Sequence, residues 1–211
     1  LHVDIPQHRI KETENLVSIL GNEVIEEFPW KNNMKPSTND NVEGVLRRTW
    51  RPALSIVGSD GLPPTANAGN VLRPYTTLQL SMRIPPTTDA SKAKEKINSV
   101  LLDNVPYQAK VSLDFEEAAC GWNAPETSSW LLEAIKKASN KYYGEDPCSI
   151  GEGGTIPFMA MLGEQFPKAQ FVITGVLGPH SNAHGPNEFL HIPFAKKLTC
   201  CISSIISDFK K

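Results

Sequence analysis

Apolar residues recur three or four positions apart in several segments of the chain, as expected for helices that bury one face. The first pattern runs until Pro29 stops it, and Asp89 and Ser91 are suitable N-caps for a later one. The predicted helices cover residues 9–27, 128–143 and 193–209. A further helix follows Asp89 and Ser91 and carries apolar residues from 93 to 101, and the segment 151–166 is predicted to be a glycine turn that leads into an apolar helix.

Four other segments have patterns typical of β-strands. Residues 75–84 and 107–116 alternate apolar and polar side chains, as strands with one buried face do. Residues 53–58 (ALSIVG) form a short apolar run, and residues 169–178 (AQFVITGVLG) form a longer one, typical of a strand buried on both faces. The stretches rich in Gly, Pro and Asn between these elements are predicted loops.

The order of these elements predicts two kinds of architecture. Strand, strand, helix and strand over residues 53–116 indicate a small antiparallel sheet with a helix on one face, an α+β arrangement. After Cys120, the order helix, helix, buried strand, loop and helix indicates part of an α/β layer. We therefore place a boundary near residue 118, between a domain of residues 1–118 and a domain of residues 119–211.

Composition and charge exclude several classes of protein. Hydrophobic residues make up 40% of the chain and charged residues 21%, as in ordinary globular domains, and the formal net charge is −2. Without a basic surplus the chain is a poor match for nucleic acid, and no apolar run is long enough to span a bilayer. The four cysteines form no CxxC pair, which favours reduced thiols in a cytoplasmic protein. The chain begins at Leu1 without a recognisable signal peptide and enters a helix almost at once, so we expect a fragment or a processed product.

Two histidines, His180 and His184, lie in the polar loop that follows the predicted strand 169–178. Ligands of open α/β sheets bind beyond the carboxyl ends of such strands, where a neutral imidazole can bind zinc. One loop supplies too few ligands for a zinc site, so both histidines are equally explained as solvated loop residues.

The segment GEGGTIP, residues 151–157, places glycines just before a predicted helix. Such a turn suits a carboxylate or phosphate, and Thr155 can donate its hydroxyl, although a plain glycine turn with a threonine cap explains the same pattern. Glu152 fits a metal ligand, an acid–base group or a solvated charge. Arg83 ends the alternating strand and can bind a carboxylate bidentately, but an ordinary surface arginine also fits there, as it does at Arg73.

Taken in order, these motifs resemble a known family. GEGGTIP, the apolar run after it, SNAHGPNEFLHIP and the amphipathic last helix are similar to the closing segment of zinc exopeptidases of the aminoacylase and carnosine-dipeptidase (cytosolic non-specific dipeptidase) type. VLRRTWRPALSIVGSDG and VLRPYTTLQLSMRIPP resemble the two middle strands of the lid domain in those enzymes. The resemblance implies an incomplete antiparallel-sheet lid (dimerisation) domain over residues 1–118 and the C-terminal segment of an α/β catalytic domain over residues 119–211.

The resemblance also implies roles for particular residues and partners. His184 corresponds to the histidine that binds the second of two zinc ions, for which manganese or cobalt are alternatives, and Glu152 is the implied catalytic residue, close to the metals. The implied partners are a short-peptide substrate and a second copy of the chain, joined through the lid domain as a homodimer. The residues implied in substrate binding are Arg83, Thr155, Gly154 and Asn70.

Three features depart from the family pattern. This chain has Gly151 where carnosine dipeptidases usually have an arginine, and Thr155 where they have a serine, so we expect a different choice of substrate. The HxD motif, the bridging aspartate, the Glu-Glu pair and the further aspartate of the family do not occur, so we expect this chain alone to be inactive. The activity implied for the intact enzyme is hydrolysis of the amide bond of dipeptides or short peptides with a free C-terminal carboxylate. A non-catalytic dimerisation or binding module and an N-acyl-amino-acid deacylase are the alternatives.

Overall fold

The computed structural model describes residues 1–151 and 157–209. The chain divides into two compact units, one formed by Leu1–Asn123 with Ile150–Met161, the other by Ala124–Ser149 with Leu162–Lys211. No helix in the described part of the chain is both long and apolar enough to cross a membrane. Helices and a small antiparallel sheet make up the fold, which confirms the predicted α+β class.

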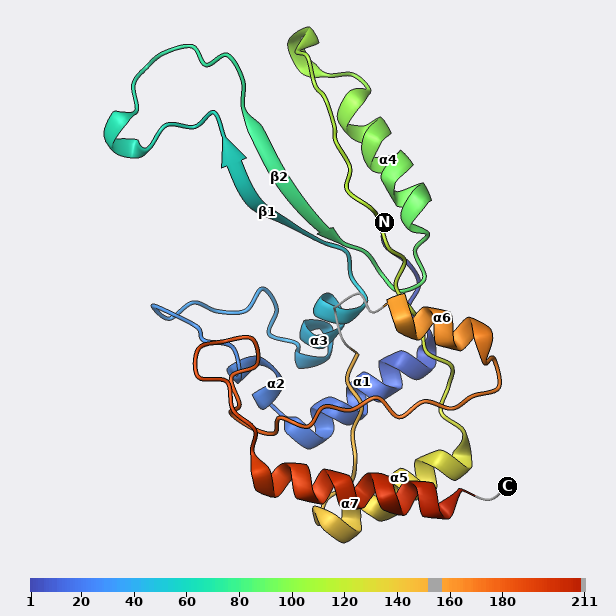
Figure 1. Ribbon diagram of the computed structural model, residues 1–211. Helices are drawn as coiled ribbons and strands as arrows, with labels where there is room; N and C mark the ends of the chain where they lie inside the picture. Colours follow the sequence, from blue (N-terminus) through green and yellow to red (C-terminus); the bar gives the residue numbers. More distant parts are fainter. Residues whose placement is uncertain (152–156, 210–211) are drawn as a thin grey trace. The chain divides into compact units, whose positions relative to one another are not determined.

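The elements follow one another along the chain as Figure 1 shows. The strands are β1 (Ala53–Asp60) and β2 (Thr77–Arg83), and short 3-10 turns lie at Thr65–Asn67 (η1) and Pro106–Gln108 (η2). The helices are α1 (Gln7–Leu20), α2 (Glu23–Glu26), α3 (Asn41–Thr49), α4 (Ala90–Leu102), α5 (Ser129–Tyr142), α6 (Pro157–Gln165) and α7 (Ile192–Asp208).

Helices α1, α2 and α3 pack around a small core in the first unit. Leu16, Val24 and Val45, one from each helix, are each 2% exposed. The prediction of a single helix over residues 9–27 is wrong, because the chain breaks at Gly21, whose φ of 58° is a left-handed conformation that ends α1. The break lets α2 turn back, so that Val24 reaches the core.

Strands β1 and β2 form an antiparallel hairpin, which confirms the two strands predicted in this region. Their register runs from Ala53 opposite Arg83 to Asp60 opposite Thr77, with a bulge between Ile56 and Gly58. The predicted burial of one face of β2 is wrong, since every residue of that strand is exposed. Among the described elements, only the partner strand makes substantial contact with either strand, so no second layer covers the apolar side chains.

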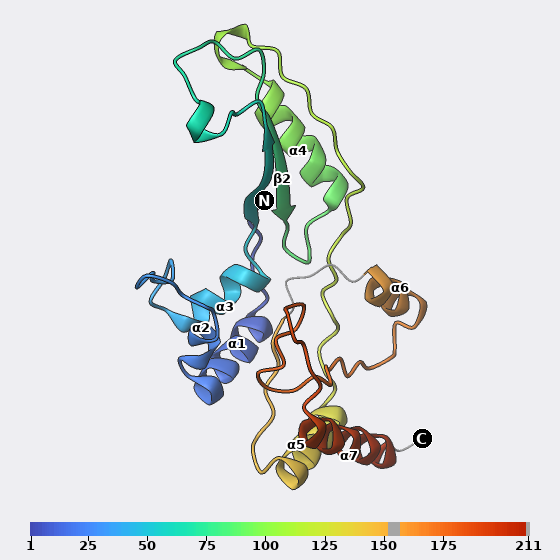
Figure 2. The ribbon, with the colours of Figure 1, turned by 60° about the vertical axis from the view of Figure 1, so that its left-hand side comes forward.

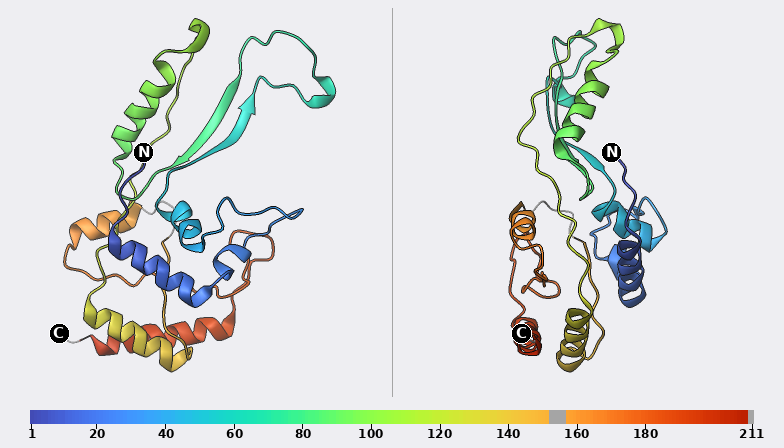
Figure 3. Two further views of the ribbon diagram at one scale, coloured as in Figure 1. Left: turned by 180° about the vertical axis from the view of Figure 1, so that it is seen from behind. Right: turned by 90° about the vertical axis from the view of Figure 1, so that its right-hand side faces the viewer.

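Helix α4 forms where predicted, with the carboxylate of Asp89 accepting a hydrogen bond from Lys92 N at 2.9 Å. The strand predicted over residues 107–116 is wrong, because after η2 the segment has no regular structure and runs back along α4 (Figures 1 and 3). Its Phe115 ring lies 4.9 Å from Lys94 Nζ. All residues of this segment except the half-buried Leu113 are exposed, so the alternation is not matched by the burial of one face, and the segment pairs with neither described strand.

Helices α5 and α7 lie side by side and antiparallel in the second unit (Figure 2). Tyr143 Oη donates to Phe194 O at one end of the pair, and the rings of Trp130 and Phe209 are 5.3 Å apart at the other. Both helices were predicted from sequence. Their shared buried cluster consists of Leu131, Ala134, Ala138, Cys201 and Ile205.

The strand predicted over residues 169–178 is also wrong. The segment has no regular structure, and Val172, Ile173 and Val176 are 40%, 58% and 49% exposed. A strand buried on both faces needs neighbouring strands to pair with, and the only strands among the described residues are β1 and β2, which pair with each other.

The α5–α7 contact provides a direct test of the core. Replacing Leu131, which is 2% exposed, by Ala should lower the free energy of unfolding by about 2–5 kcal/mol, because the cavity left in a packed interface is only partly filled. The neighbouring Leu132 is 54% exposed, so Leu132→Ala should cost less than about 0.5 kcal/mol. Urea unfolding measured by circular dichroism compares the two, and equal losses would contradict the packing described.

Candidate functional site

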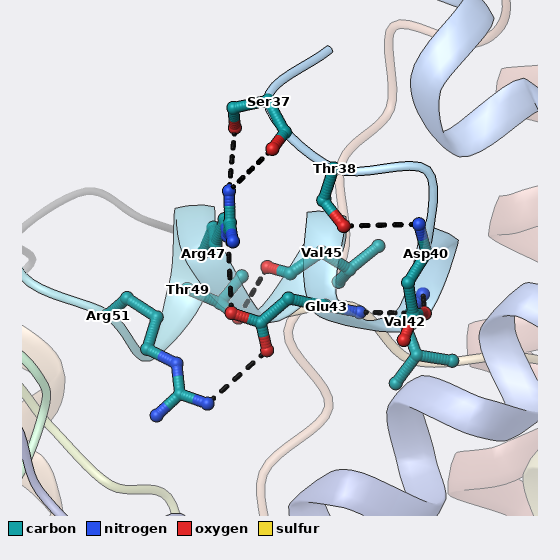
Figure 4. Close-up of polar contacts among 9 residues, drawn as sticks. All are labelled: Ser37, Thr38, Asp40, Val42, Glu43, Val45, Arg47, Thr49 and Arg51. Atoms are coloured by element: carbon teal, nitrogen blue, oxygen red, sulfur yellow. Dashed lines mark hydrogen bonds and ion pairs between the residues drawn. The ribbon is translucent and has the colours of Figure 1, made fainter.

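Helix α3 begins at a well-defined N-cap. Asp40 Oδ1 accepts from Val42 N and Glu43 N, at 2.9 and 3.2 Å, and Asp40 N donates to Thr38 Oγ1 (Figure 4). In a capping box the glutamate at this position would bond back to the cap residue's N–H. Here the N–H of Asp40 already donates to Thr38 Oγ1. The carboxylate of Glu43 therefore extends toward the other end of the helix.

The Glu43 carboxylate is shared by two arginines. Arg47 Nε donates to Oε1 at 3.2 Å and Arg51 Nη2 to Oε2 at 3.3 Å, while Arg47 Nη1 also donates to the carbonyl and hydroxyl of Ser37 (Figure 4). The hydrogen bond from Arg51 is the main cause that holds the pKa of Glu43 below its ordinary value. The three charged side chains thus connect the loop before α3, the helix itself and the chain that enters β1.

Arg83 lies at the end of the hairpin that adjoins α3. It is opposite Ala53 in the β-ladder, and Ala53 follows the end of α3 by four residues. Gly151 approaches the same end of the helix, because a Cβ placed on it would lie 3.3 Å from Thr49 Cβ. The first unit therefore brings Arg83 and the start of the GEGGTIP segment to one region, around the C-terminal turn of α3.

Asn70 is not brought to this region. It lies in the connection between β1 and β2, beyond the pair formed by Asp60 and Thr77, whereas Arg83 ends the ladder on the other side. Six residues of strand separate these two ends, which corresponds to about 20 Å. Glu152, Gly154 and Thr155 lie outside the described residues, so their predicted roles stay predictions.

His184 lies in a tightly hydrogen-bonded loop of the second unit. The neck of the loop is closed by His191 N donating to Leu177 O at 2.7 Å, and by Phe189 N donating to Ser181 O at 3.1 Å. Ser181 is 4% exposed, and its hydroxyl lies 2.8 Å from Leu177 O and 2.7 Å from Gly178 O. These contacts leave His184 exposed, on a loop with a defined backbone.

The loop has an unusual backbone. His180, Asn182, His184 and Asn187 all have φ between 53° and 61°, the left-handed region that Asn, Asp and His adopt more readily than other non-glycine residues. The carboxylate of Glu188 accepts the backbone N–H of His184 across the turn. Sequence reasoning did not assign a role to Ser181 or Glu188, although the density of Asn, His, Gly and Pro signals a chain of turns.

The described residues do not form a metal site by themselves. No group of three or more His, Cys, Asp or Glu side chains in residues 1–151 and 157–209 is arranged to hold an ion. The carboxylate of Glu188, in the same loop, accepts the backbone N–H of His184. A metal at His184 would need further ligands from outside these residues, since catalytic zinc sites use three protein ligands.

The shared carboxylate of Glu43 predicts a particular pH dependence. A pKa that is lower in the folded chain than in the unfolded one stabilises the fold above the ordinary value of 4.5, and this contribution is lost as pH falls through the folded pKa. Glu43→Gln should therefore lower the free energy of unfolding at pH 7 by about 0.5–1 kcal/mol, and by less at pH 3. Urea unfolding at the two pH values tests this. The exposed Glu14→Gln is the control, and a Glu43 effect that does not shrink in acid would contradict the assignment.

Comparisons with known proteins relate this chain to peptidases, although no protein-family model matches the sequence. It is 28% identical over 156 residues to the cysteinylglycine-S-conjugate dipeptidase of Corynebacterium striatum, covering 69% of this chain and 33% of that enzyme. It is 28% identical over 177 residues to a Cys-Gly metallodipeptidase of Saccharomyces cerevisiae, covering 80% of this chain and 35% of that enzyme. The chain thus spans about a third of the length of the curated relatives it matches.

Solved structures show the same relationship in the fold. Human carnosine dipeptidase 1 matches 98% of the chain with a TM-score of 0.64 and 18% identity, covering 43% of that enzyme. The dipeptidase Dug1p of Saccharomyces cerevisiae matches 99% with a TM-score of 0.68 and 20% identity, covering 44% of that enzyme. A metallo-carboxypeptidase of the M20 family from Sulfolobus solfataricus matches 96% with a TM-score of 0.65 and 18% identity, covering 45%. The chain is therefore a homologue of the Cys-Gly metallodipeptidases with the fold of carnosine dipeptidase and the M20 metallopeptidases, which confirms the resemblance found in its sequence.

Proposed function

We propose that this chain is part of a metallopeptidase that hydrolyses the amide bond of dipeptides or short peptides with a free C-terminal carboxylate. The relatives are dipeptidases: the names of two of them specify Cys-Gly, and the name of a third specifies cysteinylglycine S-conjugates. The observation that carries the proposal is the approach of Arg83 and Gly151 to the same end of α3, because an arginine able to bind a carboxylate then lies near the residue at which the glycine segment begins. In this proposal the first unit recognises the end of the substrate.

Recognition of the carboxylate follows from the chemistry of the residues in that region. The planar guanidinium of Arg83 can hold both carboxylate oxygens, and the hydroxyl of Thr155 and the backbone at Gly154 would complete the set. A carboxylate held in this way fixes the end of the substrate, so its C-terminal amide bond lies at a constant distance from Arg83. Asn70, also proposed to bind substrate, would act from the distant end of the hairpin.

The metal-binding part of the proposal rests on His184. Its imidazole would be one ligand of a site completed by residues beyond the described ones, with two zinc ions, or manganese or cobalt, as the proposed metals. Such ions polarise the substrate carbonyl and lower the pKa of a bound water. Glu152 is proposed to move the proton in that reaction. The hydrogen bonds of Ser181 at the neck would hold the loop that carries this imidazole.

The remaining parts of the proposal concern assembly and location. The hairpin offers an exposed apolar face on which a second copy could pack as a homodimer, and the four cysteines are all free, which supports a reducing, cytoplasmic environment. The names of the relatives favour a peptidase over a deacylase or a non-catalytic module.

The role of His184 is tested by a substitution that keeps the left-handed turn. In the full-length protein, His184→Asn should abolish hydrolysis of Cys-Gly, and the metal content measured by mass spectrometry should fall, because asparagine tolerates the backbone conformation but replaces the imidazole. His180→Asn, in the same loop with a similar φ, should retain both activity and metal. Full activity and metal content in His184→Asn would exclude it as a ligand. The 211-residue chain alone should not hydrolyse the dipeptide.

The role of Arg83 is tested by substrate selectivity. Arg83→Ala should raise the KM for Cys-Gly by about tenfold or more, since a charge-assisted bidentate contact is lost, and should abolish the preference for Cys-Gly over its C-terminal amide. Arg73→Ala, in the connection between β1 and β2, removes the same charge and should leave both unchanged. An Arg83→Ala enzyme that still discriminates acid from amide would refute the assignment.

A further inference from the structure

The arginines on Glu43 line an open hollow of about 530 Å³ at the junction of α3 and β1. Its walls are formed by His2, Glu43, Arg47, Arg51, Pro52 and Ala53. The proposed peptidase function makes no use of it, and none of its lining residues was a predicted site residue. Ala53, at its edge, is the residue opposite Arg83 in the hairpin, so the hollow adjoins the proposed carboxylate-binding region.

The two guanidinium groups have more hydrogen-bond donors than this network satisfies. Together they carry ten N–H groups. In the described part of the chain, three hydrogen bonds from Arg47 and one from Arg51 account for four of them. Among the described residues, Glu43 is the one hydrogen-bond partner of the Arg51 guanidinium, and the Arg51 side chain is 32% exposed.

The charge of the cluster favours an anion. Two guanidinium cations share one carboxylate, which leaves a net charge of about +1 at the rim of the hollow. The α3 network fixes Arg47 between Ser37 and Glu43, so one side of a binding site is already held in place and costs little further ordering. Pro52 and Ala53 line the adjoining wall, and they carry no charge that would repel an anion.

We propose that this hollow is a second binding site, which takes a small oxyanion, the phosphate or carboxylate group of a ligand, between Arg51 and Arg47. Arg51 supplies the guanidinium donors that no described residue other than Glu43 accepts, and Glu43 both orients the two arginines and competes with the ligand for them. The proposal is independent of the peptidase activity, because it invokes none of the residues assigned to catalysis or to the metal.

The test is an NMR titration of the full chain with inorganic phosphate, and in parallel with acetate, at low ionic strength, following the arginine Nε–Hε signals. Saturable binding is expected for at least one of the two anions, and the pair of titrations tells phosphate from carboxylate recognition. Arg51→Ala should weaken the binding about tenfold, and Glu43→Gln should strengthen it about threefold, since the competing carboxylate is removed.

Arg48→Ala is the matched control. It removes the same charge three residues earlier in the chain, but the Arg48 guanidinium pairs with Glu27 at 2.7 Å and lies over the ring of Phe28, outside the hollow. It should change the dissociation constant by less than about twofold. Arg51→Lys retains the charge without the fork and should weaken binding to an intermediate degree, which decides the question if Arg51→Ala does not fold. The absence of saturable binding by either anion would overturn the proposal, as would equal weakening by Arg48→Ala or no gain in Glu43→Gln.

Discussion

The carboxylate of Glu43 is the interaction that joins the end of helix α3 to the start of the hairpin in the first unit. It bonds to Arg47 within α3 and to Arg51 just beyond the helix, where the chain passes through Pro52 into β1. The hairpin has little other support, since its strands are exposed and contact mainly each other. The contacts of Arg51 at the end of the nine-residue helix α3 therefore hold the chain where it enters the hairpin, at the same end of the ladder as Arg83.

The elements that could be predicted from sequence are those whose signals are local. Amphipathic spacing located α4, α5 and α7, and alternation located β2. Helix α3 was not predicted, although Asp40 and Glu43 have the spacing of a capping box before an apolar stretch. The strands predicted at 107–116 and 169–178 failed because strand formation depends on a partner edge, which a local pattern does not reveal.

The candidate site was predictable only through resemblance. Spacing alone left His184 and Arg83 with ordinary explanations, because each is a single polar residue in a loop or at a strand end. The order of the motifs resembles that of a peptidase family, and this resemblance implied the roles of both residues. The relationship to dipeptidases is confirmed, whereas the individual roles stay predictions. The network of Glu43, Arg47 and Arg51 was missed for a physical reason: its three residues are spaced like any charged face of a helix, and only the structure shows that they converge on one carboxylate.

The backbone of the His184 loop has a consequence for how its sequence can vary. Four positions, 180, 182, 184 and 187, require a left-handed conformation, which in evolution admits mainly Gly, Asn, Asp and His. Selection for the shape of the loop alone would therefore retain histidines and asparagines there, even where they perform no chemistry. Invariance of these residues among homologues would be ambiguous evidence for catalysis. A homologue with asparagine or glycine at position 184 would have kept the loop while losing the imidazole proposed as a metal ligand.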